Sequence, residues 1–249
     1  NIKQVLENTH LLLVCDVGGG TTDLTLIKIE QNNSTEPQLT RIGVGDHLML
    51  GGDNIDLALA HIAENRITGI NNKLSAADLS QLLEQCRIAK ERLLANDAPE
   101  QINVTLLGGG SRLIGGSRTA KLTRKEVREI ALDGFFPLSK LTDLPDRKRS
   151  GVVEFGLPYA AEPAISKHIA AFLKHHHQAA AQAMGNESRV PDALLLNGGV
   201  FRSEPITQRT LDLINSWSDK KPLLLENKHP ELSVAFGAVS YAIARRDKK

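Results

Sequence analysis

The sequence predicts an α/β protein: a mixed sheet with flanking helices, into which a smaller α+β subdomain is inserted. Short apolar runs at 11–17, 24–29 and 193–196 have the length and alternation of strands. Stretches such as 75–94 instead place apolar residues at helical spacing behind a capping residue. The order is a strand meander, a helical insert, and then strand, helix, strand, helix, which indicates a lobe interrupted by a second one.

Composition and charge narrow the class of protein. Hydrophobic residues make up 41% of the 249 residues and charged residues 24%, as in soluble globular domains. The net charge of +1 gives no reason to expect a nucleic acid or an anionic membrane as partner. Cys15 and Cys86 lie in a strand pattern and a helix pattern, which predicts buried thiols and a reducing, cytoplasmic compartment. The first residue is Asn1 rather than methionine, so we expect part of a longer protein.

The first three strands should form an antiparallel meander. The runs 11–17 and 24–29 are joined by three glycines, and a polar loop at 31–38 leads to a third strand at 39–44. The sequence Gly51-Gly52-Asp53-Asn54 then opens a helix whose cap we expect to be Asp53 or Asn54.

The inserted subdomain is expected at 51–150. Ser75 opens a long helix, and strands at 102–107 and 113–122 should form a hairpin with glycines 108–110 at its tip. Thr123 and Glu126 form a second capping box, and that helix should end near Phe136. Residues 139–160 show no hydrophobic pattern typical of a helix or a sheet, and we expect an irregular connection or insertion with at most a short strand.

The main lobe, expected at 9–50 and 160–249, resumes with a helix over 163–184. Gly185 follows in the position of a left-handed cap. A buried strand at 193–196 then turns through Asn197-Gly198-Gly199 into a helix over 203–217. A last strand at 223–226 and a closing helix over 231–245, rich in small residues, complete the lobe.

The glycines at 18–20 are the first candidate for chemistry. A phosphate-binding P-loop needs Gly-Lys-Ser/Thr leading into a helix, and no lysine follows here. A dinucleotide fingerprint also leads into a helix, whereas the run 24–29 alternates with the period of a strand. Both of these familiar interpretations therefore fail.

A β-hairpin tip that folds around an anion remains. Glycines permit positive φ, so successive N–H groups can form a concave nest, and the hydroxyls of Thr21 and Thr22 add donors. Asp16, at a strand end expected to face the same cavity, could hold Mg²⁺ through water or orient an attacking water, and Asp23 could assist. The alternative is an ordinary tight hairpin in which Asp16 is only a turn former.

The turn Asn197-Gly198-Gly199 is the second candidate. It follows a buried strand and precedes a helix, so its bare backbone could lie against a flat ligand, and Arg202 could stack on a base. A simple strand–helix turn with a surface arginine is the alternative. The triplet His175-His176-His177 is not expected to bind metal, because adjacent residues point in different directions around a helix.

Together these segments resemble the ATPase domain of DnaK-type heat-shock chaperones, within the actin-like (ribonuclease H-like) ATPase superfamily. The stretch 16–23 resembles the second phosphate motif of the family, and 45–56 the segment that opens its upper lobe. The stretch 86–94 resembles the helix that contacts adenosine. The stretch 195–202 resembles the adenosine motif, and 229–238 the closing segment. The likeness covers nearly the whole chain in the order of the family.

The resemblance implies ATP or ADP with Mg²⁺ as cofactors. It implies Asp16 as the catalytic residue and Asp16 and Asp23 as the carboxylates that hold the metal through water. The nucleotide-binding residues that it implies are Gly18, Gly19, Gly20, Thr21, Gly52, Lys90, Gly198, Gly199, Arg202 and Glu231. It also implies client polypeptides and co-chaperones as partners.

The chain departs from the family pattern on one helical face. Arg87, Glu91 and Leu94 stand where the family usually has a glutamate, an arginine and a serine, and Val200 replaces a small hydroxyl. A divergent member is therefore expected. The first phosphate loop, catalytic lysine and proton-transfer carboxylate of the family lie on an N-terminal lobe that this chain lacks, so the chain by itself is not expected to hydrolyse ATP.

Two other functions stay open. One is a sugar or metabolite kinase of the same superfamily, which would need a carboxylate base facing a small-molecule cleft. The other is a non-catalytic, partner-binding module that keeps the fold and has lost nucleotide, as Glu91 and Leu94 suggest.

Overall fold

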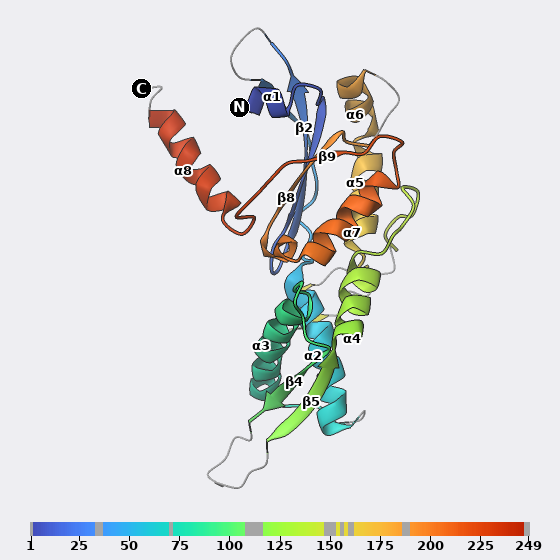
Figure 1. The fold of residues 1–249 in the computed structure, drawn as a ribbon, viewed down its shortest axis with the longest axis vertical. Helices are drawn as coiled ribbons and strands as arrows, with labels where there is room; N and C mark the ends of the chain where they lie inside the picture. Colours follow the sequence, from blue (N-terminus) through green and yellow to red (C-terminus); the bar gives the residue numbers. More distant parts are fainter. Residues whose placement is uncertain are drawn as a thin grey trace.

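The computed structural model describes residues 2–32, 37–69, 72–107, 117–146, 153–154, 157–158, 162–185 and 190–246. The described elements form two lobes that follow one another along the long axis of the molecule, a lobe built on a five-stranded sheet and a smaller lobe of helices and a hairpin (Figure 1). No helix among these residues is both long enough and apolar enough to cross a membrane.

The sheet is mixed, as the sequence predicts. Strands β1 (Leu11–Val17), β2 (Thr22–Glu30) and β3 (Gln38–Val44) form the antiparallel meander. Strand β8 (Ala193–Asn197) pairs with β1 in parallel, and β9 (Leu223–Leu224) adds the far edge, so the order is β3-β2-β1-β8-β9. The carboxylate of Asp192 accepts hydrogen bonds from the backbone N–H groups of His10 and Leu11, at 3.0 and 2.9 Å, where the parallel pair begins. The α/β class is therefore confirmed.

Helices α5 (Ile165–His175), α6 (His177–Met184) and α7 (Glu204–Asn215) cover one face of the sheet (Figure 1). The prediction of one helix over 163–184 is wrong, because the helix breaks at His176. The His176 ring packs 4.7 Å from the Phe172 ring centroid and against Gly43 of β3, which anchors the break. Gly185 ends α6 in the left-handed conformation, with φ 65°, as predicted.

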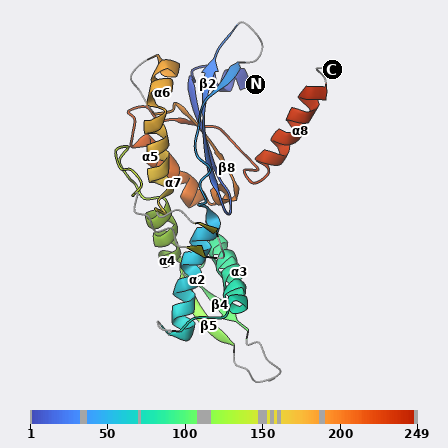
Figure 2. The same cartoon turned by 180° about the vertical axis from the view of Figure 1, so that it is seen from behind.

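The opposite face of the sheet is only partly covered. The short helix α1 (Ile2–Val5), which the sequence patterns did not predict, is followed by Leu6, which packs with Leu12, Ile29 and Ala193. The closing helix α8 (Ser233–Arg246) stands away from the sheet in both views (Figures 1 and 2), and none of its residues is buried.

The smaller lobe packs α2 (Gly52–Thr68) and α3 (Ala76–Leu93) against the hairpin of β4 (Gln101–Leu106) and β5 (Arg118–Thr123). Its capping predictions hold at two helices: the Ser75 hydroxyl accepts from Asp78 N–H at 3.2 Å, and Thr123 opens α4 (Arg124–Arg128) in a capping box. At α2 the prediction is wrong, since Gly51 is the N-cap and its N–H donates to Asn54 Oδ1. The predicted glycine tip at 108–110 lies outside the described residues.

Several elements differ in their bounds or their helix type from the sequence prediction. Strand β5 begins at Arg118, and its predicted start at 113 lies outside the described residues. Strand β9 ends at Leu224 rather than 226. The helix after Thr123 changes at Glu129 into a wide π-helix, η1 (Glu129–Phe135), which no sequence pattern announced. The Arg209 guanidinium, from α7, donates to the carbonyls of Leu132 and Phe136 at its end, at 3.3 and 3.4 Å. In the connection that follows, β6 (Val153–Glu154) and β7 (Leu157–Pro158) form a two-residue pair.

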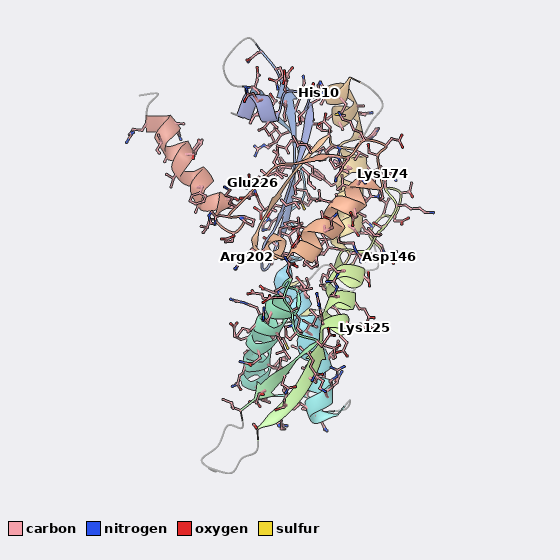
Figure 3. All side chains as sticks on the ribbon, in the orientation of Figure 1. His10, Lys125, Asp146, Lys174, Arg202 and Glu226 are labelled. Atoms are coloured by element: carbon pink, nitrogen blue, oxygen red, sulfur yellow. The ribbon has the colours of Figure 1, made fainter. Side chains whose placement is uncertain are left out.

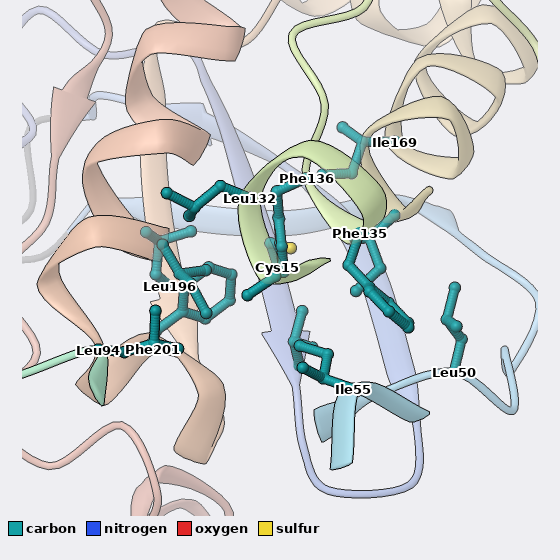
Figure 4. Close-up of a cluster of buried hydrophobic side chains, with 14 of the residues drawn as sticks. Cys15, Leu50, Ile55, Leu94, Leu132, Phe135, Phe136, Ile169, Leu196 and Phe201 are labelled. Atoms are coloured by element: carbon teal, nitrogen blue, oxygen red, sulfur yellow. The ribbon is translucent and has the colours of Figure 1, made fainter. Parts of the chain in front are cut away.

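One hydrophobic core runs through both lobes (Figure 4). At the junction, Ile55 of α2 and Leu94 after α3 belong to the same cluster as Cys15 and Leu196 of the sheet. Phe136 and Phe201 meet there edge to face, with ring centroids 6.2 Å apart. Cys15 and Cys86 are free, buried thiols, as predicted, and burial raises the pKa of Cys86 to about 12 and raises that of Cys15 further.

Candidate functional site

The β1–β2 hairpin tip is held by the first turn of α2. The backbone N–H groups of Gly52 and Asp53 donate to the carbonyls of Gly18 and Gly19, at 3.0 and 2.8 Å. Within the tip, Gly18 N–H donates to Thr21 O at 2.9 Å. The N–H groups of Gly19, Gly20 and Thr21 make no backbone hydrogen bond with any other described residue. The carbonyls of the tip are therefore satisfied by the helix, while three successive donors remain available to a ligand.

Close approach explains the glycine at 51 beside this tip, whereas a Cβ on Gly18 or Gly20 would make only ordinary contacts, at 3.7 and 3.8 Å. None of Gly18, Gly19 and Gly20 has a positive φ, so the expectation that they adopt the left-handed region is wrong. A Cβ on Gly51 would lie 2.4 Å from Gly19 O, inside contact distance of the tip backbone. Only a glycine at 51 lets the start of α2 approach the hairpin this closely.

The second glycine turn packs on the end of β1. Gly198 has φ 88°, and a Cβ there would lie 2.1 Å from Val17 O and 2.8 Å from Asp16 Oδ1. Gly198 N–H donates to Pro230 O at 2.8 Å, and Asn227 Nδ2 donates to Asn197 Oδ1 at 2.7 Å. These two bonds attach the segment before α8 to the turn, which brings Glu231 to the rim of the same site. A short 3₁₀ turn, η2 (Gly199–Arg202), then leads to α7.

Both glycine turns border one cavity of about 390 Å³ at the junction of the lobes, near the labelled Arg202 in Figure 3. Six predicted site residues line it: Gly19, Gly52, Lys90, Gly199, Arg202 and Glu231. The others, Asp16, Gly18, Gly20, Thr21, Asp23 and Gly198, do not line it, although Gly18 and Gly198 are backbone supports of its wall. The two turns therefore meet, and the strand carboxylates lie outside the cavity.

The floor of the cavity contains a buried ion pair. Lys90 Nζ lies 2.8 Å from Asp56 Oδ1 and donates to Gly52 O at 3.2 Å. Burial raises the pKa of Asp56 to about 6 even though Lys90 opposes that rise, because desolvation outweighs the attraction. Lys90 thus joins α3 to the start of α2, and its ammonium is already engaged before any ligand arrives.

The walls of the cavity differ in polarity. Leu94, Val200 and Ile206 contribute apolar side chains to the lining, which suit a flat ring. On the α3 rim, Glu91 lies 3.9 Å from Arg87 Nε, an exposed pair that solvent screens. Arg202, from η2, lines the cavity and is exposed, so its guanidinium is free to lie over a ligand.

Asp16 and Asp23 are cross-strand neighbours at the end of β1 and the start of β2. Burial, and then the charge of Asp23, raise the pKa of Asp16. Asp23 Oδ1 in turn lies 2.7 Å from His47 Nδ1. His47 belongs to the loop that two backbone hydrogen bonds between Thr22 and Leu48 attach to the sheet. Among the described residues, which include the histidine triplet, no cluster of three or more potential metal ligands occurs.

Six lining residues were not selected as site residues from the sequence: Asp53, Ile55, Asp56, Ala95, Ser203 and Ile206. For Asp53 and Asp56 a signal existed, because positions 52, 53 and 56 of one helix share a face behind the Gly51-Gly52 turn. Ile206 had none, since it reads as an ordinary core residue of α7.

Comparison with known proteins adds no family to this description. No protein-family model matches the chain, and no curated protein matches it. The function must therefore be inferred from the site itself.

Proposed function

We propose that the cavity binds ATP or ADP with Mg²⁺, and that the chain is the second half of an actin-like ATPase domain of the DnaK type. The convergence of the two glycine turns on one cavity carries this proposal. Gly19 offers a free N–H donor at the cavity, next to those of Gly20 and Thr21, and the apolar lining residues together with the Arg202 guanidinium offer contacts for the base. A bound Mg²⁺ would neutralise phosphate charge and orient the phosphate groups.

The uncovered apolar surfaces support a second lobe as partner. Val234, Phe236, Val239, Tyr241 and Ile243 of α8 are all exposed, although a helix that is apolar on most sides is normally buried. The exposed face of the sheet beside it carries Val14 and Leu195, which are only partly buried. We propose that the first lobe of the ATPase covers both surfaces and supplies the missing half of the phosphate clamp. Alone, the chain should bind nucleotide weakly and should not hydrolyse it.

The client polypeptides and co-chaperones of a DnaK-type protein, and a cytoplasmic location, belong to the same proposal. A module that has lost nucleotide is the second candidate, and the occupied Lys90 ammonium and the Arg87–Glu91 pair favour it. A kinase would need a carboxylate base at the cavity, and Asp53, in the first turn of α2 beside the tip, is one lining carboxylate that could serve.

Binding is tested by thermal unfolding with and without Mg-ATP at millimolar concentration. Ligand at a hundred times its dissociation constant would stabilise the fold by about 2.7 kcal/mol. The Arg202→Ala variant should lose most of that shift without a change in the stability of the free protein, because Arg202 is exposed and outside the core. No shift at any accessible concentration would favour the module that has lost nucleotide.

A further inference from the structure

Ser203 is the N-cap of α7, yet its hydroxyl does not cap the helix. An N-cap hydroxyl normally accepts from the N–H of the second or third helical residue, and the second residue of α7 is Pro205, which has no N–H. The backbone of Ser203 is engaged on both sides, because its N–H donates to Val200 O at 3.2 Å and its carbonyl accepts from Thr207 N–H at 3.0 Å. The residue is therefore fixed in place, while its hydroxyl takes no part in the local hydrogen bonds.

That hydroxyl is buried and unpaired. Ser203 Oγ is shielded from solvent and has no hydrogen-bond partner among the residues that the structure describes. Most buried polar side-chain atoms of folded proteins have such a partner, and a buried polar atom without one destabilises the protein. A ligand that supplies the partner would explain why an unpaired hydroxyl is kept at this place.

Ser203 also lines the cavity at the junction of the lobes. Among the described lining residues its side chain is the one that is polar and neutral, because every other polar side chain there is charged. Val200, Arg202 and Ile206 line the cavity as well, so one short segment supplies apolar side chains, a guanidinium and a neutral hydroxyl. A hydroxyl both donates and accepts, and it rotates to suit its partner.

We propose that Ser203 is the base-recognition residue of this site, and that its hydroxyl hydrogen-bonds the polar edge of the heteroaromatic base of the nucleotide. This inference rests on the proposed nucleotide function, and it adds the group that the base meets beside Arg202. On α3, Leu94 has no polar side-chain atom and the Lys90 ammonium is held by Asp56, so neither side chain competes for the base.

Removal of the hydroxyl should have opposite effects on the free protein and on the complex. In the free protein, Ser203→Ala deletes a buried polar atom that has no partner, so the melting temperature should stay the same or rise. In the complex the same change deletes one hydrogen bond, so the dissociation constant for ATP should increase about five- to tenfold. A hydroxyl with a merely structural role would instead lower the melting temperature.

The experiment is a calorimetric titration of the 249-residue chain with Mg-ATP and with Mg-ribose 5-triphosphate, which lacks the base. Wild type, Ser203→Ala and Ser166→Ala are compared. Ser166 is the matched control, because its Oγ in α5 is also buried without a hydrogen-bond partner among the described residues, and it does not line the cavity. We expect only Ser203→Ala to lose affinity for ATP, and we expect ribose 5-triphosphate to bind all three proteins equally weakly.

Equal affinities of wild type and Ser203→Ala for ATP would overturn this inference and leave the proposed function intact. The inference would also be wrong if Ser203→Ala lost as much affinity for ribose 5-triphosphate as for ATP, because the hydroxyl would then contact the sugar or the phosphate groups. A melting temperature of Ser203→Ala below that of wild type would show a partner inside the protein and overturn it too. A wild type that does not bind ATP would overturn the proposed function, and this inference with it.

Discussion

Gly51→Ala should destabilise the protein by separating α2 from the hairpin tip. The new Cβ would lie 2.4 Å from Gly19 O and 2.7 Å from Gly18 O, and both atoms belong to the backbone. Relief of this clash requires a shift of roughly 0.5–1 Å, which lengthens the hydrogen bonds from Gly52 and Asp53, now 3.0 and 2.8 Å, beyond useful range. The φ of −171° at Gly51 is extended backbone that alanine adopts freely, so the clash alone causes the loss.

The magnitude follows from those two hydrogen bonds. Each backbone hydrogen bond contributes about 1 kcal/mol, and more where a buried partner is left unsatisfied, so the total loss is about 2–4 kcal/mol. For a chain of this length that lowers the melting temperature by about 5–15 °C. The measurement is urea unfolding followed by circular dichroism.

Gly199→Ala is the matched control for Gly51→Ala. A Cβ there meets nothing within 4 Å, and the residue has no positive φ, so the change should stay within about 0.5 kcal/mol. If Gly51→Ala unfolds at the same urea concentration as Gly199→Ala, the close contact of α2 with the tip is wrong. That result would also mean that α2 does not hold the tip in the conformation that leaves three N–H donors free.

Two further predictions concern ionisable side chains. The folded-state pKa of Asp56, about 6, lies above its unfolded value of 3.8, so the folded state retains a proton that the unfolded state releases. The contribution of Asp56 to the free energy of unfolding is complete below pH 4 and is lost as the pH rises through 6, by up to about 3 kcal/mol. In urea unfolding from pH 4 to 7, the double variant Asp56→Asn, Lys90→Met should lose that part of the pH dependence. An unchanged slope of stability against pH in the double variant would refute the prediction. The opposite sign holds for Glu126, whose pKa the hydrogen bond from Arg66 lowers to about 2. The contribution of Glu126 to the free energy of unfolding is present above pH 4.5 and is lost as the pH falls through 2. Solvent screening limits the loss of stability in Glu126→Gln to about 1 kcal/mol at pH 7, measured by the same unfolding assay. A larger loss of stability at pH 3 than at pH 7 would contradict this prediction.

The sheet and the capped helices could be predicted because their signals are local. The meander follows from alternation and turn residues, and Ser75 and Thr123 act as caps through bonds within three residues of themselves. The break at His176 could not be predicted in this way, because its ring packs on Gly43 from a strand more than a hundred residues earlier. The π-helix has the same origin, since Arg209 of α7 holds its end.

The candidate site was predictable in its backbone and less so in its side chains. The two glycine turns were found from their composition, and they do meet at one cavity. Asp16 was expected to face that cavity but does not line it, and a Cβ on Gly198 would lie 2.8 Å from its Oδ1. Lys90 was expected to be available to a ligand, yet Asp56, a residue of another helix, occupies its ammonium. Such pairings depend on tertiary packing, which residue spacing within one segment does not reveal.

The hydrophobic cluster that crosses from one lobe to the other has a consequence for how this protein comes apart. Phe136 and Phe201 sit on opposite sides of the boundary and exclude water from it together. Unfolding of either lobe would expose apolar side chains of the other lobe to water, so we expect a single cooperative unfolding transition. The smaller lobe is therefore not expected to fold stably when it is expressed without the rest of the chain.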